Sequence, residues 1–158
     1  MASKNGIGIK QTFFSIVDQL FTANVVLASL LLGDSDTAPT GVRVAAGQTV
    51  MLKYWVKFTV GATGGIRLQL LVPAGGTIFS STIRLNNTVA PSQTIATQQA
   101  SAVFTSATAN AGTHWVEVEA HIVNGATAGT IDLQAAQNTS DPLTLTILRG
   151  AKVEVTKF

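Results

Sequence analysis

The chain has 158 residues, which is enough for one domain with a sizeable core, and 46% of them are hydrophobic. Charged residues make up only 11%, against roughly 25% in a typical soluble domain, and the formal net charge is +2. The lysines and arginines are scattered along the chain, which excludes the basic cluster that nucleic-acid binding needs. The absence of cysteine excludes disulfides, thiolate metal sites and cysteine nucleophiles.

A weakly charged surface is typical of a protein that packs against copies of itself or a partner, because interface cores are depleted of charge. The alternative is a stable monomer with a threonine-rich β surface. The longest apolar run, residues 23–32, contains Asn24 and Ser29 and is too short to cross a bilayer, so no membrane partner is expected. We also expect no signal peptide, because Asp18 and Gln19 interrupt the apolar residues near the N-terminus.

Residues 1–10 contain two glycines and are expected to form a flexible N-terminal arm, followed by a single domain over residues 11–158. Lys4 and Lys10 of this arm are candidate contacts to an underlying shell or a neighbouring subunit. Residues 11–32 fit both helical and strand spacing. Their β-branched and aromatic content favours two strands, with a helix as the alternative.

Asp34 and Asp36 follow, one residue apart in a turn that can hold calcium. The further oxygen ligands of a known calcium loop are missing from the sequence around them. Aspartates also cap turns for purely local reasons, so we interpret the pair as a turn. We therefore expect neither a metal site nor a cofactor.

The pattern becomes clear at residues 50–60, where apolar and polar residues alternate. A period of two places one set in a core and the other on an outward face, which is typical of a strand. The same alternation returns after Gly112, with Val116, Val118 and Ala120 facing inward. Turn residues recur throughout, and the whole pattern predicts an all-β antiparallel β-sandwich of about nine or ten strands.

The outward positions of the two clearest strands carry the candidate functional residues. Glu117, Glu119 and His121 share one strand face and could form part of a metal or acid–base site. The alternative, which we favour, is that they are solvated residues paired with Lys53 and Lys57 on the neighbouring strand.

Trp55 and Trp115 also occupy outward positions. An exposed tryptophan can anchor a protein contact or stack on a sugar, and it can also be covered by a loop or by the arm. We treat both tryptophans, together with the charged residues around them, as a possible interface or ligand contact.

No catalytic apparatus is predicted. His114 and His121 are the only histidines available as candidate bases, and neither a nucleophile elbow nor a phosphate-binding loop is present in the sequence. Glu117 and Glu119 are the only candidate pair for glycoside hydrolysis, which needs two carboxylates across a cleft. We therefore expect a protein that is not an enzyme.

Two stretches carry a resemblance to a known group of proteins. The first is residues 40–49 (TGVRVAAGQT), which lead into LKYWVKF at residues 52–58 and LVPAGG at residues 71–76. The second is GTIDLQAAQNTS at residues 129–140 and TILRGAKVEV at residues 146–155.

This arrangement resembles small β-sandwich virion proteins of tailed bacteriophages, such as capsid decoration, head-fibre and tail-fibre-tip proteins. Gly150 and Ala151 stand where that group usually has Gly-Ser, a departure that affects one turn. The resemblance covers roughly residues 40–156 and is a pattern of strands and turns rather than a catalytic signature.

The resemblance implies a jelly-roll-like fold, often trimeric, on the virion exterior. Its expected partners are copies of itself and the phage major capsid protein or another virion protein, after assembly in the host cytoplasm. We favour a capsid decoration protein that acts by packing. The alternative is a tail or fibre-tip adhesin that binds a host-surface glycan.

Overall fold

The computed structural model describes residues 8–15, 17–21, 26–30, 41–61, 65–87, 93–98, 103–105, 111–139 and 141–158. These residues form β1 (Ile9–Phe14), β2 (Gln19–Phe21), β3 (Ala28–Ser29), β4 (Val42–Val44), β5 (Thr49–Val60), β6 (Ile66–Leu71), β7 (Thr77–Asn87), β8 (Gln93–Gln98), β9 (Val103–Thr105), β10 (Gly112–Val123), β11 (Gly129–Gln137), β12 (Leu145–Ile147) and β13 (Lys152–Lys157). Within these ranges the structure has no helix that is long and apolar enough to cross a membrane.

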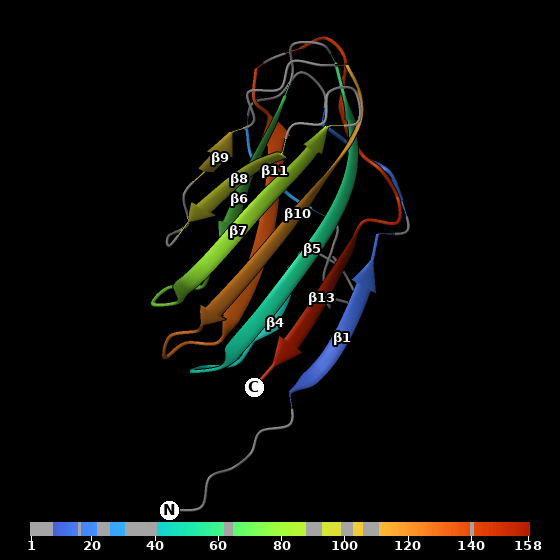
Figure 1. Ribbon diagram of the computed structural model, residues 1–158. Helices are drawn as coiled ribbons and strands as arrows, with labels where there is room; N and C mark the ends of the chain where they lie inside the picture. Colours follow the sequence, from blue (N-terminus) through green and yellow to red (C-terminus); the bar gives the residue numbers. More distant parts are fainter. Residues whose placement is uncertain are drawn as a thin grey trace, which may run out of the picture.

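The strands form two antiparallel sheets that enclose the core (Figure 1). The larger sheet has the order β1-β13-β5-β10-β7-β8, with β12 beside β5 and β2 beside β12. The smaller sheet has the order β3-β11-β6-β9, with β4 also beside β11. The predicted all-β antiparallel sandwich is confirmed. The strands outnumber the prediction because residues 11–32 contribute to three strands in place of two, and because β4 is too short to show an alternation.

The pairings follow the order of a long hairpin that has been rolled up. β1 pairs with β13, β3 and β4 pair with β11, β5 pairs with β10, and β6 pairs with β9. Early strands thus meet late strands from the two ends of the chain inward, which gives the jelly-roll topology that the resemblance implies. The hairpin of β7 and β8 is inserted before β9 and extends the larger sheet beyond β10.

The alternating residues of β5 and β10 build the centre of the core, as predicted. Tyr54 and Phe58 of β5 are fully buried, and Val118 of β10 lies directly opposite Tyr54. Leu68 of β6 and Leu133 of β11 belong to the same buried cluster from the smaller sheet. Burying a side chain of this size contributes about 1.5–3 kcal/mol, so these two layers are a main source of stability.

The Ala-Ala-Gly-Gln sequence before β5 forms a tight turn. The backbone N–H of Gln48 donates to the carbonyl of Ala45 at 3.3 Å, and the side chain of Asn124 donates to the same carbonyl at 2.7 Å. Gly47 has a φ of 67°, which favours glycine because other residues meet a steric cost there. The contact from Asn124 ties this turn to the end of β10.

The N-terminal region differs from its prediction. The described residues between 11 and 32 lie in or between three strands, β1, β2 and β3, rather than two. β1 begins at Ile9, so the last two residues of the predicted arm belong to the larger sheet. Lys10 is placed opposite Thr156 of β13 and is a sheet residue rather than a free contact. Lys4, Asp34 and Asp36 lie outside the described residues.

Candidate functional site

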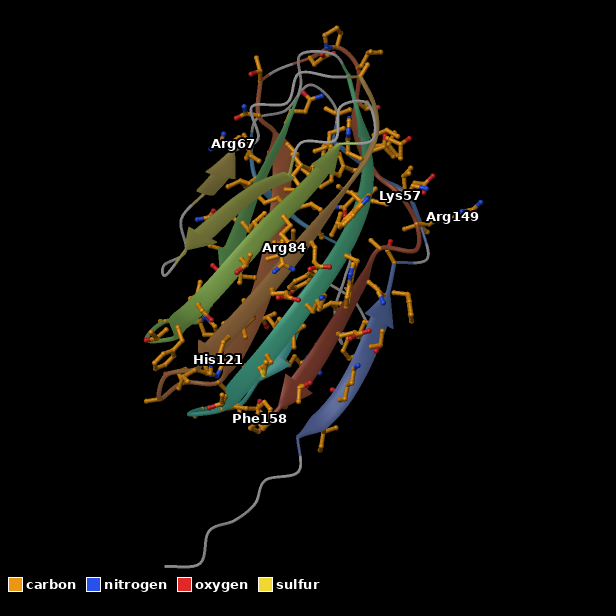
Figure 2. The ribbon with its side chains drawn as sticks, in the orientation of Figure 1. Lys57, Arg67, Arg84, His121, Arg149 and Phe158 are labelled. Carbon is orange, nitrogen blue, oxygen red and sulfur yellow. The ribbon has the colours of Figure 1, made fainter. Side chains whose placement is uncertain are left out.

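The side chains of β7, β10, β5, β13 and β1 that point away from the smaller sheet form what we call the outer face. Their register places them in rows that run across the strands. One row contains Thr82, Glu119, Lys53, Glu154 and Thr12, and the next row towards the N-terminus of β5 contains Ser80, His121, Met51, Thr156 and Lys10. Figure 2 shows Arg84, Lys57 and His121 on this face.

Lys53 is the centre of an ion-pair network on the outer face. Its Nζ lies 2.5 Å from Glu119 Oε1 and 3.3 Å from Glu117 Oε1, and Arg84 donates to the same Glu117 oxygen at 2.8 Å. The hydrogen bond from Lys53 to Glu119 is the main cause that raises the pKa of Lys53 above its ordinary value. The predicted pairing with Lys53 is therefore confirmed, whereas Lys57 makes no ion pair within the described residues.

A second network joins the two strands at the edge of the sheet. Lys10 of β1 lies 3.1 Å from Glu154 of β13, and Lys152 lies 3.4 Å from the other oxygen of the same carboxylate. The hydrogen bond from Lys10, followed by that from Lys152, holds the pKa of Glu154 below its ordinary value. Both networks neutralise charge within the face.

Trp55 lies between these networks. Lys152 Nζ is 3.9 Å and Lys53 Nζ 4.8 Å from a ring centroid of Trp55, so two ammonium groups make cation–π contacts with one indole. These lysines cover part of the indole, and Trp55 is half-buried. Trp115 is the outward residue of β10 that precedes Glu117. It lies opposite Lys57 of β5 and is 37% exposed.

The two histidines have different surroundings. His114 is 2% exposed and its ring packs against Phe58, 5.5 Å between centroids, so it belongs to the core. His121 lies on the outer face, where its ring is 5.7 Å from that of Phe79. The described residues hold no group of three or more His, Asp or Glu side chains placed to bind a metal ion.

A β-bulge in β7 places Phe79 there. The register between β7 and β10 shifts between His121 and Ile122, so that Phe79 and Ser80 both point outward while Ile78 and Ser81 are buried. A bulge of this kind turns a side chain towards a new direction and increases the local twist. The bulge therefore exposes the Phe79 ring beside His121.

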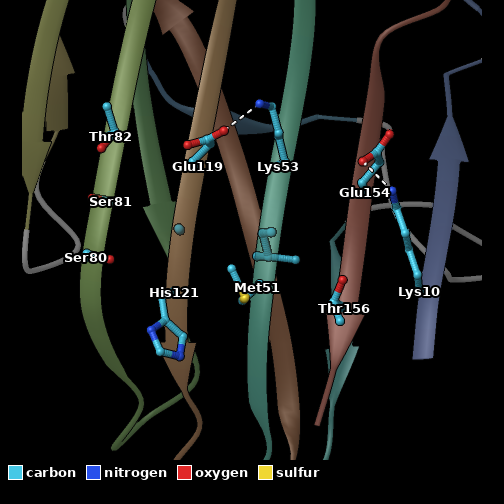
Figure 3. A pocket seen from close by; sticks show the side chains of 12 residues that line it. Lys10, Met51, Lys53, Ser80, Ser81, Thr82, Glu119, His121, Glu154 and Thr156 are labelled. Atoms are coloured by element: carbon cyan, nitrogen blue, oxygen red, sulfur yellow. Dashed lines mark ion pairs between the residues drawn. The ribbon is translucent and has the colours of Figure 1, made fainter. Parts of the chain in front are cut away.

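An open groove of about 350 Å³ crosses the outer face next to this bulge (Figure 3). Of the predicted site residues, it brings together Lys10, Lys53 and Glu119, whereas Trp55, Trp115, Lys57 and Glu117 lie outside its lining. The lining also includes His121, which the sequence pattern singled out beside Glu119. Sequence reasoning missed other lining side chains, namely Met51, Ser80, Thr82, Glu154 and Thr156. Only the cross-strand register, which alternation alone does not supply, gathers them.

No family model matches this chain, and no curated protein matches it either. Among solved structures, the chain is similar to a chain from the structure of infectious bursal disease virus, Gt strain, with a TM-score of 0.25 and 12% identity. That alignment covers 96% of this chain and 42% of the other, so this chain spans less than half its length.

Proposed function

We propose that this chain is a non-enzymatic structural protein of a tailed-bacteriophage virion, and specifically an exterior capsid decoration protein. It acts by packing against copies of itself, as a trimer, and against the major capsid protein or another protein of the shell. The proposal joins the resemblance in the sequence to one structural observation, the exposed apolar edge formed by β1.

β1 overhangs the sandwich. Gln11 is directly opposite the buried Val155 and points to the same side of the sheet, yet Gln11 is exposed, because β1 is the edge strand of the larger sheet. Ile9 on that side is 65% exposed, and Phe14 on the outer side is 60% exposed. An exposed apolar edge strand attracts further pairing and packing, and monomeric proteins normally protect such edges.

The neighbouring chain segments extend this apolar edge. Leu20 of β2 and Leu143, just before β12, are both strongly exposed, and β2 pairs with β12. Most charged side chains of the outer face are paired with each other. A neighbouring subunit that packs against the apolar edge therefore meets few unpaired charges. A protein whose work is adhesion to neighbours is expected to expose such side chains.

The carboxylates support the non-enzymatic part of the proposal. Glu117 and Glu119 point to the same outer face from one strand instead of facing each other across a cleft, and both contact Lys53. A glycan-degrading activity of the purified protein that disappears in the double variant Glu117→Gln, Glu119→Gln would contradict this part.

The proposed packing of this chain, as a trimer and against the shell, is tested with purified protein and with capsids from a virus strain that lacks this protein. We expect a trimer by light scattering and saturable co-sedimentation with the capsids. Phe14→Ser and Leu20→Ser should each weaken trimer formation or capsid binding by about tenfold, because each removes an apolar contact. Thr130→Ser, an exposed position on the smaller sheet, is the matched control. A wild-type monomer that leaves the capsids bare would contradict the proposal.

A further inference from the structure

The groove on the outer face is formed by residues of five adjacent strands. It is lined from β7, β10, β5, β13 and β1, which are neighbours in this order in the larger sheet. Four inter-strand spacings of roughly 4.8 Å give it a length of about 19 Å across the strands. Its volume of about 350 Å³ lies within the range of small-molecule sites, and its length suits an elongated ligand.

Short hydroxyl side chains line two sides of the groove. Ser80 and Thr82 stand on β7, and Thr156 stands on β13 (Figure 3). In the register, Ser80 lies opposite His121, and Thr156 lies opposite Met51. A hydroxyl both donates and accepts hydrogen bonds, so these positions suit a ligand that does the same.

The charged groups of the groove are already neutralised. Lys53 is paired with Glu119 at one place and Lys10 with Glu154 at another. Two cations and two anions leave no net charge to select an ionic ligand. The carboxylates still have lone pairs to offer, because within the described part of the chain only one oxygen of Glu119 has a partner.

Apolar surface lies beside these polar groups. Met51 is 52% exposed in the lining, and Phe79 is 59% exposed next to His121. The Phe79 and His121 rings lie 5.7 Å apart between centroids with their planes inclined by 33°, so they form an aromatic pair beside the β7 end of the groove. Sugar rings combine a C–H face with a rim of hydroxyls, and this groove offers a counterpart for each.

We infer that the groove binds a neutral oligosaccharide. Glu119 accepts hydrogen bonds from sugar hydroxyls, Ser80, Thr82 and Thr156 exchange further ones, and the Phe79–His121 pair packs against the C–H face of a sugar ring. This activity goes beyond the proposed decoration function and does not depend on it. If the subunit is displayed in many copies on one particle, weak binding at each groove adds up to a high avidity for a surface glycan.

The test is an NMR titration of the ¹⁵N-labelled full chain with three neutral probes: maltotetraose, cellotetraose and the β-1,4-linked tetramer of N-acetylglucosamine. We expect saturable shifts with at least one probe, confined to the amides of β5, β7, β10 and β13 that line the groove. Glu119→Gln replaces a charged hydrogen-bond acceptor by a weaker neutral one, and Phe79→Ala removes the aromatic ring, so each should weaken that binding by about tenfold.

Matched controls separate binding from folding. Thr130→Ser on the smaller sheet should leave the affinity unchanged, and thermal unfolding reports whether each variant is folded. The inference is overturned if none of the three probes gives saturable shifts in the groove, or if Glu119→Gln and Phe79→Ala fold and bind as the wild type does. Saturable binding of inorganic phosphate or of an acidic peptide in the groove, in place of the sugars, would equally reject it. Capsid co-sedimentation is measured separately, so failure of one proposal is distinguishable from failure of the other.

Discussion

Replacing Lys53 with methionine tests the electrostatic description of the outer face. Methionine keeps the apolar stem but removes the ammonium group, which contacts Glu119 at 2.5 Å, Glu117 at 3.3 Å and the Trp55 ring at 4.8 Å. The Lys53 side chain is 33% exposed, so each ion pair contributes about 0.2–1 kcal/mol, and the cation–π contact about 0.5–1 kcal/mol. We expect Lys53→Met to lower the free energy of unfolding by about 1–2 kcal/mol, and the Tm by about 2–8 °C.

The direction of the pKa shift of Lys53 also predicts how the effect of Lys53→Met depends on pH. The pKa of Lys53 is raised in the folded state, so its stabilisation is fully present below the ordinary value of 10.5 and is lost as the pH rises through the folded-state pKa. The difference between wild type and variant, measured by urea unfolding, should therefore be constant from pH 7 to 10 and shrink above that range. It should also shrink in about 1 M salt, where the Debye length falls to about 3 Å.

Lys57→Met is the matched control, because Lys57 lies on the same face of the same strand and has no ion pair within the described residues. Its effect should stay within about 0.5 kcal/mol. The reasoning is refuted if Lys53→Met is no more destabilising than Lys57→Met, or if its full effect persists at high pH and high salt. Either result would assign the role of Lys53 to packing.

Three further predictions concern the core, a turn and the sheet edge. Leu68→Ala, at a fully buried position of β6, should cost about 2.7–5 kcal/mol in urea unfolding, whereas the exposed control Val26→Ala should stay within about 0.5 kcal/mol; equal effects would contradict the assigned core. A Cβ on Gly125 would lie 2.7 Å from the Gly75 carbonyl, so Gly125→Ala should lower the unfolding free energy by about 1–3 kcal/mol, and an unchanged midpoint would exclude this contact. The pKa of Glu154 is lowered, so its stabilisation is present above the ordinary value of 4.5 and lost as the pH falls through the folded-state pKa. Wild type should thus be more stable than Glu154→Gln at pH 7, with a gap that closes in acid; a gap independent of pH would contradict the role of Lys10 and Lys152.

Alternation was enough to predict the centre of the fold. In β5 and β10 nearly every second side chain is buried, as the sequence indicated, because a strand that faces a core on one side repeats every two residues. The outward placement of Trp55, Glu117 and Glu119 followed from the same period. β4 and one of the three strands near the N-terminus escaped prediction because two or three residues do not display a period, and their pairing partners are distant in the sequence.

The groove could not be predicted, because it depends on which residues of different strands lie opposite one another. Lys10 and Glu154 are far apart in the chain and meet only through the pairing of β1 with β13. The bulge left a weak signal in the sequence, since the buried Ile78 and Ile83 of β7 are five residues apart, an odd spacing that breaks the alternation. Once the register is known, the row containing His121 and Met51 follows directly.

The most direct test of the proposed function is a count of this protein in purified particles of a tailed bacteriophage whose genome carries its gene, by quantitative mass spectrometry against the major capsid protein. A decoration protein repeats with the symmetry of the shell, so the account predicts hundreds of copies in each particle, released together with the shell and not with the tail. Its absence from the particle, or a handful of copies that purify with isolated tails, would contradict the account. A tail location would favour the adhesin alternative.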